Sequence, residues 1–142
     1  MKSWKLTLLF ATLLSTGVAV SETVPPIDLS QAIILADLQK SPRVVSTAAQ
    51  VLAEEVAKRT GISVPIEKRW TQDRPIIALV CTKTRLFGKR IPGAIPHDPE
   101  SFRIYTDLTS KRCPIIWIIG ADGRGVLFGV GYLLRQLDWS PN

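Results

Sequence analysis

The sequence predicts a single α/β domain of the α+β type, in which a mixed sheet of about five strands carries two helices on one face. Two short apolar runs, 76–80 and 115–119, are rich in β-branched residues, which is typical of strands buried on both faces. Two longer segments, 42–60 and 126–137, repeat apolar residues at helical spacing instead. A chain of 142 residues has room for one such domain.

The expected order of elements along the chain is β-α-β-β-β-β-α. The strands are expected at 31–36, 62–66, 75–82, 101–106 and 115–119. Pro65 favours an edge or bulged position for the second strand, because proline cannot donate a hydrogen bond to a sheet. The segment 83–100 holds several prolines and a glycine and is expected to be a long exposed loop. Each helix has one apolar stripe and the two can cover one face of the sheet, so the other face is expected to be partly wet or covered by something else.

Capping residues mark both ends of the first helix. Ser41 is expected as the N-cap, and Pro42 as the first helical residue, where its missing N–H is harmless. Gly61 is expected to end the helix in a left-handed conformation. On the exposed side, Glu54 and Glu55 each precede a basic residue by four positions, which favours ion pairs.

The N-terminal segment 1–21 has the layout of a secretory signal peptide. Lys2 and Lys5 precede an apolar run at 6–20, and small residues then favour cleavage after Ala19 or Ser21. A membrane anchor is the alternative, but the run is shorter than the roughly 20 residues that span a bilayer. The mature protein is therefore expected to be secreted or periplasmic, with no membrane contact after cleavage. Its domain would comprise 31–137, after an extended lead-in at 22–30 and before the start of a linker at 138–142.

The charge pattern argues against nucleic acid as a partner. The chain has a net charge of +6, but its basic residues are scattered, apart from a loose group between Lys83 and Arg90. A nucleic-acid surface needs a clustered basic stripe. The two cysteines, Cys81 and Cys113, either form one disulfide or lie apart as small buried residues, and both alternatives stay open. No metal-ligand spacing occurs, and neither a metal nor a cofactor is expected.

A glycine-rich turn, 120–125, lies between the last strand and the last helix, where phosphate-binding loops occur. It departs from the dinucleotide pattern, because Asp122 stands where that pattern has its second glycine. Asp122 is expected to cap the helix instead. Gly123 and Gly125 are expected to let the helix and the strand approach closely, and Gly125, Gly129 and Gly131 are expected to pack the helix tightly on the sheet. Gly120 belongs to the same structural motif.

No catalytic constellation emerges from the sequence. Hydrolysis of a glycosidic bond uses two carboxyl groups that flank it. Asp98 and Glu100 lie near His97 in the proline-rich segment, where a solvated loop is the favoured interpretation. Ser101 has no nucleophile-elbow sequence around it. We therefore predict no catalytic residues in this chain, and the sequence leaves open whether the chain is part of an enzyme.

Three stretches together resemble the non-catalytic N-terminal α/β domain of bacterial glycoside hydrolases, namely β-N-acetylhexosaminidases of family 20 and α-glucuronidases of family 67. The stretches are 52–65, 101–104 and 118–135, and the resemblance covers 32–137. The last motif of that domain is matched by several residues, with Phe128 where tyrosine is common: Gly120, Asp122, Gly125, Gly129, Leu133 and Leu134.

The resemblance implies an accessory domain of a secreted carbohydrate-degrading enzyme, of hexosaminidase or α-glucuronidase type, without activity of its own. In such enzymes the catalytic residues belong to a (β/α)₈ barrel, so the implied partner is a barrel in cis or in trans. This chain would then be a truncated product, a fragment or a stand-alone domain. The alternative is a carbohydrate-binding module that stacks sugars on tryptophan. Its candidates are Trp70, Trp117, which is expected in the core, and Trp139, which is expected to be exposed.

Overall fold

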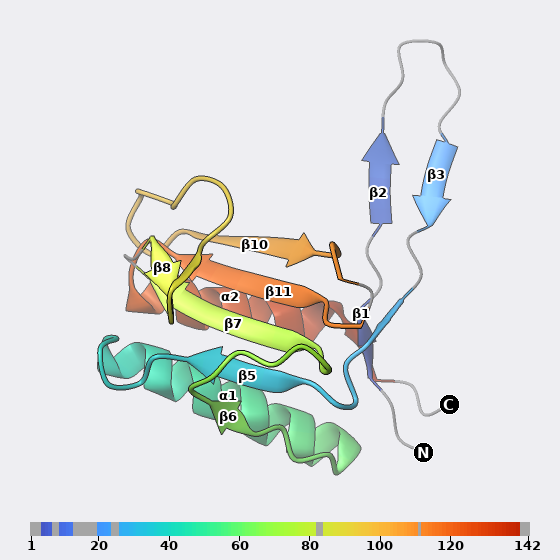
Figure 1. Cartoon of the computed structure of the whole chain (residues 1–142), viewed down its shortest axis with the longest axis horizontal. Helices are drawn as coiled ribbons and strands as arrows, with labels where there is room; N and C mark the ends of the chain where they lie inside the picture. The colour runs from blue at the N-terminus through green and yellow to red at the C-terminus, as the bar shows by residue number, and fades with distance from the viewer. Residues whose placement is uncertain are drawn as a thin grey trace.

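A mixed five-stranded sheet with two helices on one face forms the body of the protein, which confirms the predicted fold class (Figure 1). The computed structural model describes residues 4–6, 9–12, 20–23, 26–81, 84–110 and 112–139. Across the sheet the strands follow the order β10 (Phe102–Asp107), β11 (Ile115–Gly120), β7 (Ile76–Cys81), β5 (Ile33–Ala36) and β6 (Ile66–Glu67). β10 is antiparallel to β11, and the other pairs are parallel.

The two central strands, β7 and β11, consist entirely of buried residues. Their register sets Ile115 beside Ile76 and Gly120 beside Cys81. Because side chains alternate along a strand, Ile77, Leu79, Ile116 and Ile118 face one core, and their neighbours face a second core on the other side. A continuous apolar run therefore marks a strand covered on both faces.

Both helices, α1 (Arg43–Thr60) and α2 (Gly123–Gln136), lie on the same side of the sheet (Figure 1). Their buried stripes join the first core, as expected. The N-cap of α1 differs from the prediction by one residue: Pro42 is extended, with ψ at 147°, and its carbonyl accepts the N–H of Val45 at 2.9 Å. The prediction of Ser41 as the N-cap is thus wrong, because Pro42 itself occupies the N-cap position that precedes the first helical residue. Gly61 ends the helix with φ at 75°.

The prediction of a long exposed loop between β7 and β10 is partly wrong. It forms a short hairpin, β8 (Arg85–Leu86) and β9 (Lys89–Arg90), which lies over the sheet on the side away from the helices (Figure 1). Leu86 and Ile91 are buried in the second core, and Ile95 packs against it. This segment therefore covers the face that the helices leave open. The expected strand at 62–66 is also shorter, because only Ile66–Glu67 pairs, at the sheet edge that Pro65 indicated.

A second, three-stranded sheet joins the two ends of the chain. β1 (Lys5–Leu6) pairs with both β4 (Ile27–Asp28) and β12 (Leu137–Asp138), and it lies between them. The predicted linker start is therefore partly a strand. β2 (Leu9–Thr12) pairs with β3 (Val20–Thr23). Of the predicted signal segment, residues 1–3, 7–8 and 13–19 lie outside the described part of the chain, and so does the cleavage position at Ala19. Within the described ranges, no helix has the length and apolarity needed to cross a bilayer.

Cys81 and Cys113 are buried and are not joined to each other. Cys81 ends β7 beside Gly120, whereas Cys113 precedes the start of β11. Seven residues of strand therefore separate the two along the sheet, which is roughly 20 Å at the usual rise per residue. A disulfide requires Cα atoms within about 7 Å of each other. Of the two alternatives, the structure therefore has the second: the two cysteines lie apart as buried residues.

Candidate ligand-binding pocket

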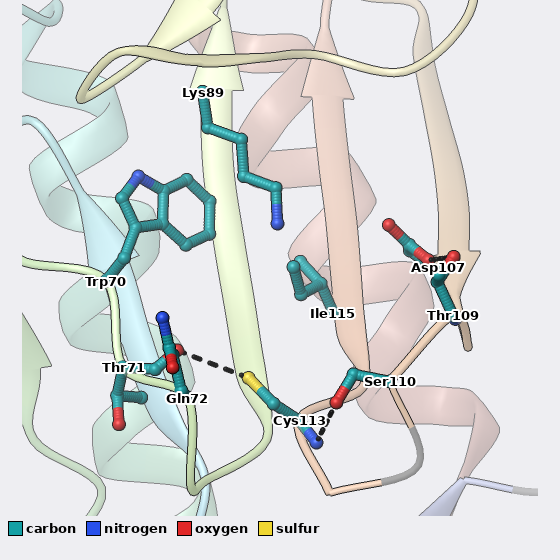
Figure 2. A pocket seen from close by; sticks show the side chains of 9 residues that line it. All are labelled: Trp70, Thr71, Gln72, Lys89, Asp107, Thr109, Ser110, Cys113 and Ile115. Atoms are coloured by element: carbon teal, nitrogen blue, oxygen red, sulfur yellow. Dashed lines mark hydrogen bonds between the residues drawn. The ribbon is translucent and has the colours of Figure 1, made fainter.

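An open pocket of about 630 Å³ lies on the helix-free side of the sheet (Figure 2). That volume is within the roughly 300–1,000 Å³ typical of small-molecule sites. Three segments that are distant in the sequence build it. The first is the β6–β7 loop, and the second is strand β9. The third runs from the end of β10 through the following loop to Ile115, the first residue of β11. The described residues that line it are Trp70, Thr71, Gln72, Lys89, Asp107, Thr109, Ser110, Cys113 and Ile115.

Trp70 forms one wall, and its indole ring is held from two sides. Its Nε1 donates to the carbonyl oxygens of Leu86 and Phe87, at 3.2 and 3.3 Å, which ties the ring to the hairpin. The ring also packs at a tilt against Trp117, with 5.5 Å between centroids. Aromatic pairs at this separation attract one another through their quadrupoles. The ring is therefore fixed before any ligand arrives.

Lys89 brings a positive charge to the same wall. Its Nζ lies 4.9 Å from the centroid of the Trp70 ring, which is a cation–π contact. Figure 2 shows the side chain running down into the pocket, with its ammonium group between Trp70 and the opposite wall. The ammonium group therefore offers hydrogen-bond donors at the centre of the pocket.

Asp107 brings a carboxylate to the opposite wall (Figure 2). Its Oδ1 accepts the backbone N–H of Thr109 at 2.9 Å and the Thr109 hydroxyl at 2.6 Å. These hydrogen bonds, with a smaller contribution from the charge of Lys89, lower the pKa of Asp107 below its ordinary value. The group is therefore ionised at neutral pH and acts as an acceptor.

Cys113 belongs to the floor of the pocket, beside Ile115. Its backbone N–H donates a hydrogen bond to the Ser110 hydroxyl oxygen at 3.2 Å, and its Sγ lies 3.4 Å from the carbonyl oxygen of Thr71. Burial is the main cause that raises the pKa of this thiol above its ordinary value. A nucleophilic cysteine needs a lowered pKa. The burial and the raised pKa of Cys113 therefore favour a structural role in the pocket.

The described lining of the pocket lacks the pair of carboxyl groups that glycoside hydrolysis uses. Asp107 is the single carboxylate among its described lining residues, whereas the two-carboxyl mechanism requires a pair. Ile115 begins β11, so the pocket lies at the amino ends of the parallel strands. Its described lining can bind a small polar molecule and offers no second carboxyl group.

The glycine-rich turn lies at the carboxyl ends of the strands, and the carboxylate of Asp122 within it is hydrogen-bonded to the backbone. Asp122 is the N-cap of α2: its Oδ1 accepts the N–H of Gly125 at 2.8 Å, and its Oδ2 accepts the N–H of Glu100 at 3.0 Å. These bonds lower the pKa of Asp122. Glu100 in turn forms an ion pair with Arg124 at 2.7 Å. His97 and Asp98 are exposed nearby. The turn therefore ties the loop before β10 to the start of α2 through hydrogen bonds and one ion pair.

Most of the glycines predicted to pack tightly lie at close contacts, but the prediction is wrong for Gly131, where a Cβ would meet only the Arg135 guanidinium, at 3.8 Å. A Cβ at Gly120 would meet the backbone of Asp122 and Val126 at 2.5 Å, and one at Gly129 would meet Ile118 at 2.5 Å. At Gly125 a Cβ would collide with the carbonyl oxygen of Ser101. Helix α2 therefore rests on β10 and β11 at van der Waals distance because these positions have no side chain.

Of the three tryptophans proposed as sugar platforms, Trp70 alone borders the pocket. Trp117 is 1% exposed, as its apolar run predicted. Trp139 was wrongly expected to be exposed, because it stacks on Trp4 and has the Arg59 guanidinium 4.8 Å from its ring. Lys89 and Asp107 were not predicted as pocket residues, because segments that are distant in the sequence bring them together.

Comparison with known proteins shows the fold and leaves the family open. No protein-family model and no curated protein matches this chain. Among solved structures, it is similar to a GH115 4-O-methyl-α-glucuronidase with specificity for decorated arabinogalactans, with a TM-score of 0.54 and 16% identity. The match covers 74% of this chain and 13% of that one. A GH138 enzyme targeting pectin rhamnogalacturonan II matches with a TM-score of 0.44 and 19% identity, over 74% of this chain and 10% of its own. Neither belongs to the families 20 and 67 expected from the sequence.

Proposed function

We propose that this chain is a non-catalytic accessory domain of a carbohydrate-active enzyme of the glycoside-hydrolase type. The observation that carries the proposal is the shared fold: 74% of the chain superimposes on a segment that makes up 13% of an α-glucuronidase. A domain that is so small a part of a large enzyme fits an accessory role. The specific type, hexosaminidase or α-glucuronidase, is part of the proposal that rests on sequence motifs alone.

The chemistry of the described residues supports a role without turnover. A glycosidase acid needs a raised pKa, so that it still carries its proton near neutral pH. In the described part of the chain, the carboxyl groups with a shifted pKa, Asp73, Asp107 and Asp122, are all shifted downward. Each is held by hydrogen bonds to its charged form. These groups fit structural and binding roles better than proton transfer.

The proposal includes a (β/α)₈ barrel as the catalytic partner, in cis or in trans, and a secreted or periplasmic location. The lysine-flanked apolar run near the N-terminus supports export. N-terminal sequencing of the protein recovered from its native host tests this part. A chain that starts at Val20 or Glu22 is the expected result, whereas a chain that starts at Met1 would contradict export by a cleaved signal.

Sequencing the DNA on either side of the 142 codons tests the partner directly. The proposal expects a barrel-encoding frame, either continuous with this one or in a neighbouring gene. Co-expression of the two parts should then yield a complex that co-purifies. A genome in which no glycoside-hydrolase barrel accompanies this frame would contradict the accessory role.

A further inference from the structure

We propose that the pocket beside Trp70 binds a neutral pyranose sugar, with the ring stacked on Trp70 and its hydroxyl groups bound by Lys89 and Asp107. This inference deepens the accessory role and rests on it for the biological source of the sugar. The ligand class itself follows from the chemistry of the pocket walls.

A sugar ring needs a flat, immobile apolar surface for its C–H face, and Trp70 provides one. Its indole is fixed by two hydrogen bonds through Nε1 and by the tilted contact with Trp117. A ring that is already ordered loses little conformational entropy on binding, which is the advantage of a preorganised site. Ile115, on the floor, extends the apolar surface.

The hydroxyl groups of a sugar both donate and accept, and the pocket offers partners of both kinds. Asp107 is an ionised acceptor whose orientation is fixed by Thr109. Across the pocket, the Lys89 ammonium group donates (Figure 2). Hydrogen bonds to charged groups are roughly twice as strong as neutral ones. Ser110 and Gln72 add groups that can do either.

The balance of charge selects a neutral ligand. The described lining contains one cation, Lys89, and one anion, Asp107. An anionic sugar would gain from Lys89 but would lie against the carboxylate of Asp107, and a cationic ligand would meet the reverse situation. A neutral ring with hydroxyl groups on its rim uses both walls without either penalty.

Saturation-transfer NMR with methyl glycosides of glucose, galactose, mannose and xylose tests the inference, because its signal does not depend on Trp70 fluorescence. At least one of these probes should receive saturation at its ring C–H protons, with a millimolar Kd. Asp107→Asn and Trp70→Ala should each weaken binding by about tenfold, which corresponds to about 1.4 kcal/mol. Phe128→Ala removes an exposed aromatic ring from the helix side of the molecule and should leave binding unchanged.

Methyl glucuronide, compared in the wild type and in Lys89→Ala, separates the neutral-sugar site from an anion site. We expect weaker binding of the glucuronide than of the best neutral probe. Transfer to the glucuronide alone, abolished in Lys89→Ala, would overturn the proposal. Absence of transfer to every neutral probe would overturn it too, as would binding that Asp107→Asn and Trp70→Ala leave unchanged.

Because Trp70→Ala removes packing from Trp117, its thermal unfolding is measured alongside. Asp107→Asn keeps the test decisive if that variant does not fold. The failure of this inference and that of the accessory role remain distinguishable. Loss of sugar binding with no turnover would remove the site and keep the accessory domain, whereas turnover of a glycoside would remove the accessory role itself.

Discussion

The indole rings of Trp4 and Trp139 lie stacked in parallel, with 6.0 Å between their centroids and 7° between their planes. The contact joins the two ends of the chain across the small sheet in which β1 lies between β4 and β12. Trp4 is fully buried, and its carbonyl oxygen accepts the N–H of Leu29 at 2.9 Å. In the uncleaved chain the N-terminal strand is thus a packed part of the fold, and cleavage after Ala19 or Ser21 would remove both Trp4 and β1 from it.

Replacing Trp4 by alanine should lower the free energy of unfolding by about 3 kcal/mol, because truncating a buried tryptophan removes its burial and leaves a cavity. Urea denaturation of the full chain measures the effect. Phe128→Ala is the matched control: this ring is 47% exposed, and its loss should cost well under 1 kcal/mol. Equal stability of Trp4→Ala and wild type would show that β1 does not contribute to the fold.

Two glycines of α2 should respond to alanine in opposite directions. At Gly125, a Cβ would collide with the carbonyl oxygen of Ser101, so Gly125→Ala should destabilise the protein by about 3 kcal/mol. At Gly131, the nearest atom within reach of a Cβ is the Arg135 guanidinium at 3.8 Å, so the added methyl group fits. Gly131→Ala should raise stability by up to about 1 kcal/mol through helix propensity. No loss at Gly125 would contradict the close contact with Ser101, and a loss at Gly131 would contradict the free space around that residue.

The cap formed by Asp122 should make part of the stability depend on pH. Hydrogen bonds from Gly125 and Glu100 lower the pKa of this carboxyl group in the folded state. Its contribution is therefore complete above the ordinary aspartate pKa of about 4 and is lost as the pH falls through the lower, folded value. Asp122→Asn retains one capping oxygen and carries no charge.

Chemical denaturation at a series of pH values, in the wild type and in Asp122→Asn, measures that contribution. The difference in stability between the two proteins should be constant at neutral pH and should shrink below about pH 4. A difference that grows on acidification would contradict the assigned hydrogen bonds.

Cys81 and Cys113 should both remain thiols. Their positions at opposite ends of the paired strands β7 and β11 exclude a bond between them without rebuilding the sheet. Protein purified without reductant and then denatured should therefore release two reactive thiols per chain. Thermal stability should also be the same with and without reductant. A chain with no reactive thiol after denaturation would contradict the register of the sheet.

The elements that could be predicted from the sequence are those whose pattern is local. A short continuous run of β-branched residues such as 115–119 predicts a strand buried on both faces, and β11 is such a strand. A stripe of apolar residues at helical spacing predicts a helix, and α2 is one. The hairpin inside 83–100 was not predicted, because the prolines and glycines of this segment indicated a loop. Two of its apolar residues, Leu86 and Ile91, nevertheless pack on the sheet.

The pocket could not be predicted, for a physical reason. Its walls come from the loop after β6, the hairpin and the end of β10, and the sheet order brings these together only in the folded chain. Trp70 was singled out as an aromatic residue, but nothing in its neighbourhood pointed to Lys89 or Asp107. The error at Trp139 has the same origin, since its partner, Trp4, lies at the other end of the sequence.

Hydrolysis of a panel of 4-nitrophenyl glycosides by the purified chain tests the central claim, that this domain binds and supports but does not catalyse. We expect no release of nitrophenol above the blank, and the same result for Asp107→Asn. Turnover by the wild type that Asp107→Asn abolishes would contradict the claim and would make the pocket an active site.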